Sequence, residues 1–314
     1  MERIVTFPGF GWEFHVNPVL LSITESFGIH WYGVIIAAGF LLAVLWCSRQ
    51  SHHFGIKEEY CLDILFSTVP LSIIGARLYY VAFEFESYYV PGDWKATLIK
   101  IIRIWDGGLA IYGGIIMAFL TAAVFCKVRK TSFFAFADLG SMGFLIGQLV
   151  GRWGNFVNVE AFGSLTDVPW RMAGPNVANY LLRTGQIDTA VQQQIIEGTL
   201  GVHPTFFYES VWNLIGLLLM ALVLRDRRKF DGQMFFSYIA WYGLGRFWIE
   251  SLRTDSLFIP GTGLRVSQVI ALASALISIA IILYMLLVKK PDRSGLYVNR
   301  LKERAVSEDV CEDP

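Results

Sequence analysis

The sequence predicts an all-α integral membrane protein with about seven transmembrane helices. Of its 314 residues, 54% are hydrophobic and only 17% are charged, whereas soluble domains carry about 25% charged residues. Apolar runs long enough to cross ~30 Å of hydrocarbon, roughly 20 residues at ~1.5 Å each, recur along the whole chain. Basic residues gather in alternate connections, and this pattern indicates the direction of each span.

Seven apolar runs account for the predicted spans. Three of them contain no Asp, Glu, Lys or Arg: residues 26–48, 107–126 and 266–288. Four more qualify with a single charged residue apiece: 64–83 with Arg77, 139–159 with Arg152, 204–224 with Glu209, and 232–249 with Arg246. The chain start lacks a basic segment followed at once by an apolar core, so we expect no cleavable signal peptide.

The distribution of basic residues predicts an amino terminus outside the cell and a carboxyl terminus in the cytoplasm. Twelve Lys and Arg residues lie in four short segments: 49–57, 127–130, 225–229 and 289–293. The connections on the other side hold eight, spread over a much greater length. Cytoplasmic connections of membrane proteins carry the excess of basic residues, which gives the orientation.

The longest connection, residues 158–203, is predicted to form a small extracytoplasmic cap. It combines the turn-forming segment "GSLTDVPWRMAGPN" with the polar, helix-like segment "TAVQQQIIEG". We expect the cap to belong to a single transmembrane domain over residues 1–290, followed by a polar cytoplasmic tail over 291–314.

Composition argues against several kinds of partner. The net charge is zero, so no nucleic-acid-binding surface is indicated. Neither the four cysteines nor any group of carboxylates and histidines has metal-ligand spacing, and we expect no metal and no cofactor. Because no histidine and acid motif accompanies a cysteine, four reduced thiols are favoured over a catalytic cysteine.

Six polar residues are predicted to share one level in the outer half of the bilayer: Arg77, Arg152 and Arg246 on helices that rise from the cytoplasm, and Tyr32, Tyr112 and Glu209 on helices that descend from outside. The arginines lie roughly 21 to 30 Å above the cytoplasmic ends of their spans at ~1.5 Å per residue. Each costs roughly 2.5 to 3.5 kcal/mol to insert, so three oppose insertion by about 7 to 10 kcal/mol. Something must compensate for this cost.

Ion pairing inside the protein is one form of compensation. Arg246, Glu250 and Arg253 are spaced i, i+4 and i, i+3 and could form a structural ladder of charges. Arg152 lies near a helix end, where its side chain could extend to the outer interface. The glycine-rich segment "DGGLAIYGG" at 106–114 fits either a re-entrant entry to the third span or close helix packing.

Phosphate binding is the functional alternative, because guanidinium groups give short, charge-assisted and often bidentate hydrogen bonds to phosphate. In a membrane the abundant phosphate is a lipid headgroup. Arg152 and Asn155 lie three apart on one helical face, and Tyr242 and Arg246 repeat this arrangement at i, i+4.

The segment "GRWGNFVNVEAFG" at 151–163 resembles the signature of the prolipoprotein diacylglyceryl transferase family of bacterial membrane enzymes. Four further segments are similar to family segments: "HWYG" at 30–33, "GAR" at 75–77, "HPTFFYE" at 203–209 and "YGLGRFWIESLR" at 242–253. The resemblance implies transfer of the diacylglyceryl group from phosphatidylglycerol to the lipobox cysteine thiol of a prolipoprotein signal peptide. A thioether forms and glycerol phosphate leaves, as the first step of lipoprotein maturation. It also implies a multi-pass protein of the bacterial cytoplasmic membrane, with an active site toward the outer face.

The resemblance and the depth argument together nominate the site residues. The catalytic candidates are Arg152 and Arg246 for the phosphate, and Glu160, Glu209 and Tyr112 as proton acceptors or orienters. The further substrate-binding candidates are Tyr32, Arg77, Asn155, Asn158, Gly163, Tyr242 and Glu250. Some family members have a histidine where this chain has Tyr112, and Glu160 could instead anchor the cap.

Electrostatic stabilisation is expected to outweigh activation of the substrate thiol. A thiol of pKa near 8.5 is a few per cent ionised at pH 7, so full deprotonation gains at most roughly thirtyfold, about 2 kcal/mol. A typical enzyme supplies ~8 kcal/mol or more. An anion or lipid transporter and a noncatalytic lipid-binding scaffold remain as alternatives, although the chain has no evident inverted repeat.

Overall fold

The computed structural model describes residues 3–22, 28–254, 258–259 and 261–312. They fall into two compact units. The first unit contains Met1–Cys47 and Asp138–Gly295, and the second contains Ser48–Ala137 and Leu296–Pro314.

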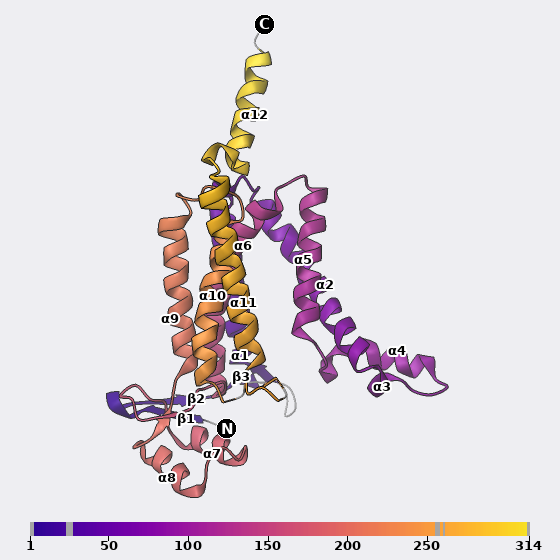
Figure 1. The fold of residues 1–314 in the computed structure, drawn as a ribbon. Coiled ribbons are helices and arrows are strands. Elements are labelled where there is room, and N and C mark those ends of the chain that lie inside the picture. Colours follow the sequence, from indigo (N-terminus) through magenta and orange to yellow (C-terminus); the bar gives the residue numbers. More distant parts are fainter. Residues whose placement is uncertain (1–2, 23–27, 255–257, 260, 313–314) are drawn as a thin grey trace. The chain divides into compact units, whose positions relative to one another are not determined.

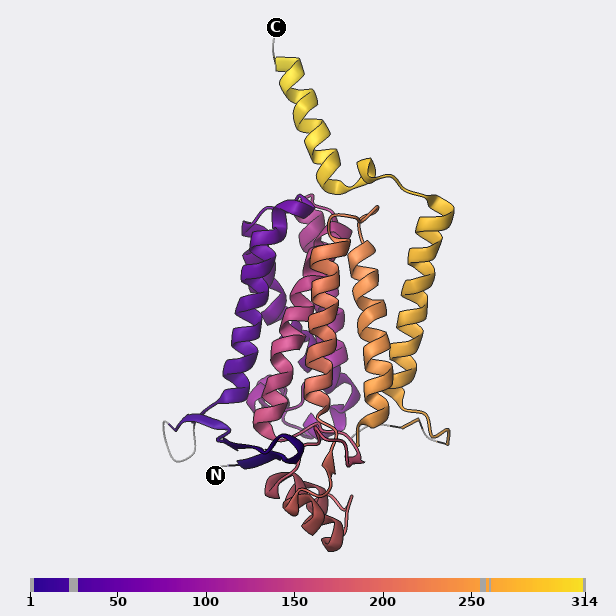
Figure 2. The same cartoon turned by 90° about the vertical axis from the view of Figure 1, so that its left-hand side faces the viewer.

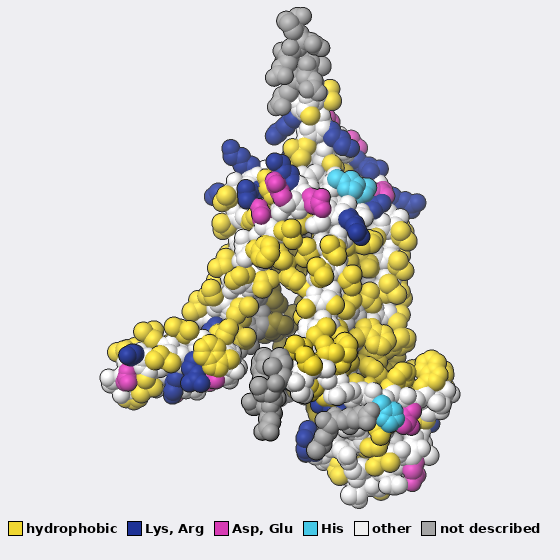
Figure 3. Space-filling view, turned by 180° about the vertical axis from the view of Figure 1, so that it is seen from behind, with side chains coloured by type: hydrophobic (Ala, Val, Ile, Leu, Met, Phe, Trp, Pro, Cys, Tyr) yellow, Lys and Arg dark blue, Asp and Glu magenta, His cyan; other side chains and the backbone are white. Residues whose placement is uncertain are grey.

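Each of the seven predicted spans contains one long helix, although residues 28–30 of the first form β4 (Gly28–His30) and residues 107–110 of the third precede the helix. These helices are α1 (Trp31–Gln50), α2 (Glu59–Phe83), α5 (Ile111–Val128), α6 (Phe133–Asn158), α9 (Thr205–Leu218), α10 (Gln233–Leu252) and α11 (Val266–Leu283). Residues 26 and 27 of the first predicted span lie outside the described residues. Among the described residues, six of these helices are long and apolar enough to cross a membrane, and α10 is not one of the six. Hydrophobic side chains cover the sides of the long helices in Figure 3.

The first unit is a bundle of α1, α6, α9, α10 and α11 with a cap at one end (Figures 1 and 2). Its helices approach closely at small residues. The Trp212 and Trp241 rings of α9 and α10 stack at 4.4 Å, and each indole N–H donates to the other residue's carbonyl oxygen at 2.9 Å. Gly216 and Gly245 lie against these two indoles, so a side chain at either glycine would displace a ring. This packing sets α10 directly beside α9.

A buried aspartate on α6 caps the first turn of α10. Asp138 in the first turns of α6 is fully buried, and its carboxylate accepts the backbone N–H groups of Gly232 and Phe235 at 2.8 and 2.9 Å. These N–H groups would otherwise lack partners at a helix start, so a charge buried inside the bundle is matched by hydrogen bonds.

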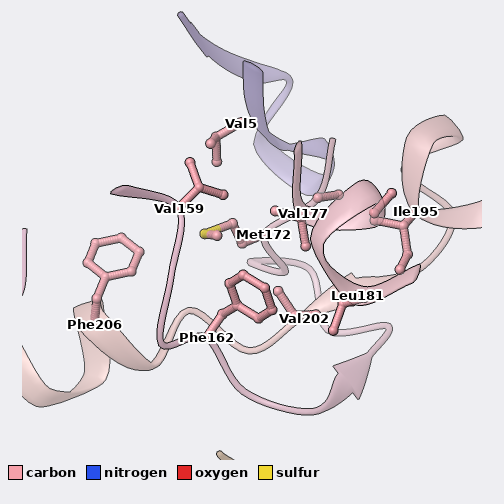
Figure 4. Packing of buried hydrophobic residues seen from close by; sticks show 11 residues of the cluster. Val5, Val159, Phe162, Met172, Val177, Leu181, Ile195, Val202 and Phe206 are labelled. Carbon is pink, nitrogen blue, oxygen red and sulfur yellow. The ribbon is translucent and has the colours of Figure 1, made fainter. Parts of the chain in front are cut away.

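The cap is built from the predicted 158–203 segment and from the amino terminus, for which no strand was predicted. It contains β5 (Leu165–Thr166), α7 (Pro175–Arg183), α8 (Thr189–Glu197) and β6 (Gly201–Val202), together with the hairpin β1 (Arg3–Phe7) and β2 (Trp12–Val16). Backbone hydrogen bonds of 2.9 Å in both directions join Thr6 to Ala173. Figure 4 shows Val5 of this hairpin among Val159, Met172 and Val177 in the apolar core of the cap. A further hairpin, β3 (Val19–Ser22) with β4 (Gly28–His30), precedes α1.

The second unit pairs α2 with α5 and adds the short helices α3 (Phe85–Tyr88) and α4 (Trp94–Ile102). Gly75 and Gly113 face each other where α2 and α5 touch: a Cβ on Gly113 would lie 2.4 Å from the Gly75 carbonyl oxygen. Close packing therefore explains this glycine of the "DGGLAIYGG" segment. The predicted polar tail contains α12 (Tyr297–Glu312), which contacts the Ser51–Phe54 turn of the same unit.

Candidate active site

Three arginines converge on the carboxylate of Glu209, at the end of the bundle that carries the cap. Arg152 in the last two turns of α6 lies 2.5 Å from Glu209, Arg246 on α10 lies 3.0 Å away, and Arg253, just after α10, lies 3.6 Å away. Arg152, Glu209 and Arg246 are thus brought together by direct contact, and their depth in the bilayer stays a prediction.

Glu250 supplies a second carboxylate. Its Oε2 lies 2.6 Å from Arg246, one helical turn earlier, so this part of the predicted charge ladder forms. The Arg265 guanidinium also donates to the Glu250 carbonyl oxygen. We call Arg152, Arg246, Arg253, Glu209 and Glu250 the arginine cluster.

The arginine cluster brings three guanidiniums and two carboxylates together. The Glu209 side chain is only 4% exposed, whereas the Arg152 side chain is 21% exposed. The Glu209 carboxylate is therefore buried, whereas part of the Arg152 guanidinium side chain is accessible to a ligand. Planar guanidinium donors at that surface suit phosphate.

The asparagines of the signature segment hold Glu160 rather than an arginine. Asn155 and Asn158 donate to the same carboxylate oxygen of Glu160, at 3.1 and 3.2 Å. The chain can double back in this way because α6 ends at Asn158 and Val159 adopts a left-handed conformation, with φ of 49°. Among the described residues, the other Glu160 carboxylate oxygen receives no hydrogen bond.

Gly163 allows the cap to meet the end of α10. Its N–H donates to the His203 carbonyl oxygen at 2.8 Å, and it forms an antiparallel bridge with Arg253. A Cβ at this position would lie 2.8 Å from the His203 Cβ and 3.0 Å from the Leu252 carbonyl oxygen. Gly163 thus acts through backbone approach and helps to place Arg253.

Two predicted tyrosines lie on α1 and α10 of the first unit. The ring of Tyr32, at the start of α1, packs on Gly154 of the signature segment, where a Cβ would lie 2.8 Å from the ring. Tyr242 lies one turn before Arg246 on α10 and stacks with Tyr238 at 6.0 Å.

Arg77 and Tyr112 belong to the second unit. Arg77 is 5% exposed and uses all three guanidinium nitrogens. Its acceptors are the carbonyl oxygens of Lys100, Ile101, Arg103, Gly107 and Gly108 at 2.6–3.1 Å, and the Tyr88 hydroxyl at 3.0 Å. These six bonds use its whole donor capacity. Tyr112, in the first turn of α5, is exposed.

His203 has a role in the cap. Its Nδ1 lies 3.1 Å from the Tyr208 hydroxyl, which also accepts the Trp170 indole N–H at 2.7 Å. Burial lowers the pKa of His203 from its usual value, which favours the neutral imidazole.

Two features were missed by the sequence analysis. Arg253 was considered only as a partner of the Arg246 ladder, although it reaches Glu209 on another helix. The aromatic amino-terminal hairpin was not considered as part of the site. The "WIESLR" spacing was a signal for Arg253, whereas no local pattern connects the hairpin to the cap.

The described residues contain no group of three or more His, Cys, Asp or Glu that could hold a metal ion. Cys47, Cys61 and Cys126 are free thiols in the described part of the chain. Fold and site therefore define a helical membrane protein with a buried cationic cluster at one end of its bundle, which is a site suited to an anionic ligand.

Comparison with known proteins gives the family. The model of the family described as "Prolipoprotein diacylglyceryl transferase" matches residues 18–284. The chain belongs to this family and is a transferase.

Three bacterial relatives are each named "Phosphatidylglycerol--prolipoprotein diacylglyceryl transferase". The relative from Lysinibacillus sphaericus is 41% identical over 279 residues, covering 88% of this chain and 94% of the relative. That from Listeria innocua is 39% identical, covering 86% and 90%. That from Geobacillus kaustophilus is 41% identical, covering 81% and 87%.

Proposed function

We propose that this protein transfers the diacylglyceryl group of phosphatidylglycerol to the lipobox cysteine of a prolipoprotein and releases glycerol phosphate. The observation that carries the proposal is the arginine cluster, in which three guanidiniums share the buried Glu209 and the Arg152 side chain stays 21% exposed. The names of the relatives supply the two substrates.

The reaction is a displacement at carbon. The cysteine sulfur attacks the glyceryl carbon that bears the phosphate, a C–S bond forms, and the C–O bond to the phosphate breaks. The electron pair of that bond stays on the departing oxygen, and the thiol proton passes to an acceptor. Negative charge grows on the phosphate as it leaves, so pre-positioned guanidiniums lower the barrier most where they contact it.

Arg152, Arg246 and Arg253 bind the phosphate in this mechanism. Glu209 acts as the residue that positions them, because its carboxylate already holds all three guanidiniums. Glu250 holds Arg246 from the other side. A set of donors fixed before the reaction needs no reorganisation when charge develops.

Glu160 is the proposed proton acceptor. Asn155 and Asn158 orient its carboxylate through one oxygen and leave the other available to the thiol. Tyr32 and Tyr242 supply headgroup contacts, and Gly163 places Arg253.

Arg77 and Tyr112 are assigned supporting roles in the second unit. Arg77 holds the loop before α5 through its carbonyl contacts. Tyr112 is exposed in the first turn of α5, and its role as proton acceptor or orienter stays a prediction.

The proposed topology has seven spans, with α10 as the span additional to the six most apolar helices. The amino terminus and the cap lie outside, the tail lies in the cytoplasm, and the arginine cluster faces the outer leaflet of the bacterial cytoplasmic membrane. Residues 1–290 form the catalytic domain. The uneven distribution of basic residues supports this orientation.

The test mixes the purified protein with phosphatidylglycerol and a synthetic lipobox peptide and follows the peptide mass. A transferase adds a diacylglyceryl group to the cysteine, whereas a transporter or scaffold leaves the mass unchanged. Arg152→Gln should lose about 10²-fold or more in kcat, as expected for removal of a key transition-state donor. Arg152→Lys should recover only part of it, because an ammonium cannot form the bidentate contact.

Arg304→Gln is the matched control, since it removes the same charge from an exposed position on α12. Its activity should stay near that of the wild type. Normal thioether formation by Arg152→Gln would contradict the assignment of this arginine to the phosphate.

A further inference from the structure

The turn that follows α6 contains strained backbone on both sides of Glu160. In the described part of the chain four non-glycine residues have a positive φ, and two of them are Val159, at 49°, and Ala161, at 55°. This left-handed region is unfavourable for a residue that carries a Cβ. Local preference therefore opposes the conformation in which Glu160 receives the hydrogen bonds of Asn155 and Asn158. Strained backbone of this kind persists only where the surrounding structure holds it.

A side chain from the amino terminus holds the start of this turn. The Arg3 guanidinium donates to the backbone carbonyl oxygen of Asn158. Asn158 ends α6, and the last carbonyl groups of a helix have no partner inside that helix and favour a cation. Because the Asn158 side chain donates to the Glu160 carboxylate, Arg3 acts on Glu160 through one intervening residue.

The cap fixes Arg3 in turn. Arg3 begins β1, and the next residue, Ile4, donates its N–H to the Asn176 side chain of α7 at 2.8 Å. Val5 is fully buried in the cap core near Val159, as Figure 4 shows. The amino-terminal hairpin therefore presents the guanidinium to the turn from a packed position.

A buried hydroxyl holds the other end of the turn. Thr205, the first residue of α9, donates from Oγ1 to the Ala161 carbonyl oxygen. Thr205 is fully buried, so loss of its hydroxyl would leave that carbonyl without its protein donor in a site shielded from water. The two strained residues thus lie between a guanidinium on one side and a hydroxyl on the other.

We propose that Arg3 and Thr205 are positioning residues for the Glu160 carboxylate. Both act on the backbone of the turn, and their hydrogen bonds keep the strained conformation in which one Glu160 oxygen receives the two asparagines and the other faces the substrate thiol. The inference rests on the proposed function, because the role of Glu160 as proton acceptor belongs to it.

The first test measures transfer to the lipobox peptide by Arg3 variants. Arg3→Gln should lower kcat about tenfold, as expected for loss of a hydrogen bond from a charged donor, and leave the KM for phosphatidylglycerol within about twofold of the wild-type value. Arg3→Lys should recover most of the loss, because an ammonium also donates to a carbonyl oxygen. Arg183→Gln on α7 is the matched control, since it removes the same charge from an exposed position of the cap, and it should keep the wild-type kcat. An unchanged kcat in Arg3→Gln would overturn the role of Arg3.

The second test separates the Thr205 hydroxyl from its packing. Thr205→Val keeps the shape of the side chain and removes the donor, so kcat should fall about tenfold. Thr205→Ser keeps the donor and should stay within about threefold of the wild type. Equal kcat values for the two variants would overturn the role of the hydroxyl.

Relief of the strain distinguishes positioning from general damage to the cap. Glycine adopts a left-handed φ without the Cβ penalty, so Ala161→Gly added to Arg3→Gln should raise kcat about threefold or more above that of Arg3→Gln alone. General damage to the cap would not respond to this change. No gain from the added glycine would overturn the proposal that Arg3 holds a strained turn.

Hydrogen–deuterium exchange of the full-length protein provides a readout that does not depend on turnover. The N–H groups of Val159 and Glu160 donate to carbonyl oxygens of α6 at 3.0 and 3.1 Å. Exchange in segment 157–164 should become about tenfold faster in both variants that lose a donor, whereas segment 175–197 should be unchanged. Faster exchange in a protein that forms no thioether would overturn the proposed function and retain the contacts that hold the turn. Normal transfer with unchanged exchange would overturn the positioning role alone.

Discussion

Glu209 is the residue on which the site depends. Three arginine side chains carry large rotational freedom, and their guanidiniums repel one another unless an anion lies between them. One buried carboxylate fixes all three and leaves cationic surface for a ligand. Glu209 therefore compensates the cost of burying the arginines and still leaves guanidinium surface for an anion. Internal ion pairing and phosphate binding, the two alternatives from the sequence, are thus compatible.

Replacement of Glu209 by glutamine should destabilise the protein by about 3 to 5 kcal/mol, because it leaves buried guanidiniums without their partner. Transfer activity should fall with it. Thermal unfolding in detergent measures the loss, and added inorganic phosphate should raise the variant's Tm more than that of the wild type. The exposed Glu197→Gln on α8 is the control and should change stability by no more than about 0.5 kcal/mol. An unchanged Tm for the Glu209 variant would contradict this account.

His203 should make stability depend on pH. Burial lowers its pKa in the folded protein below the usual value of 6.5, so the unfolded chain binds this proton more readily. The free energy of unfolding should therefore fall as the pH drops from 6.5 through the lowered pKa of the folded state, and be constant above 6.5.

His203→Asn should lack this contribution. The Tm difference between wild type and variant should shrink on acidification, measured in detergent from about pH 8 to pH 5. A difference that is constant over this range would show that His203 does not titrate differently in the two states.

At the scale of elements, glycines serve two distinct purposes in the segment before and within α5. Gly107 and Gly108 have positive φ angles of 89° and 78° and turn their carbonyl oxygens to Arg77. Gly113 instead lets α5 approach α2. The loop before α5 is thus held by the buried Arg77 guanidinium, whereas α2 and α5 pack closely because Gly113 has no side chain.

Gly113→Ala should destabilise the protein by about 1 to 3 kcal/mol, because overpacking must move a backbone. The added Cβ would lie 2.3 Å from the Tyr79 Cβ. Gly147→Ala on α6 is the matched control: nothing lies within 4 Å of its Cβ position, and it should be neutral or stabilising by up to about 1 kcal/mol. Thermal unfolding of both variants in one detergent provides the comparison, and equal Tm values would refute close packing at Gly113.

At the scale of the whole molecule, the cluster joins residues far apart in the chain. Arg152 ends one helix, Glu209 begins the next long helix, and the cap connects them, so all three cluster segments meet at the capped end.

Site-directed labelling tests the proposed orientation. In a Cys311→Ser background, Gln193→Cys on the cap should react with a membrane-impermeant maleimide in intact cells, since this position is exposed. Arg304→Cys on α12 should react only after the membrane is permeabilised. The reverse pattern would invert the topology.

The sequence by itself determined the helical membrane class, a long helix within each predicted span, and four members of the arginine cluster: Arg152, Arg246, Glu209 and Glu250. These follow from local regularities: apolar runs matched to bilayer thickness, and single charges whose position along a helix sets their depth. The family signature was equally readable, since it lies within one segment.

Only the tertiary structure decided how the charges are shared. Arg253 reaches Glu209, Arg77 is saturated by carbonyl oxygens, and the amino-terminal hairpin completes the cap. Each of these contacts joins segments that are distant in the chain or irregular in conformation. The spacing of hydrophobic residues along the sequence does not predict such contacts, because they depend on how the loops bring distant segments together.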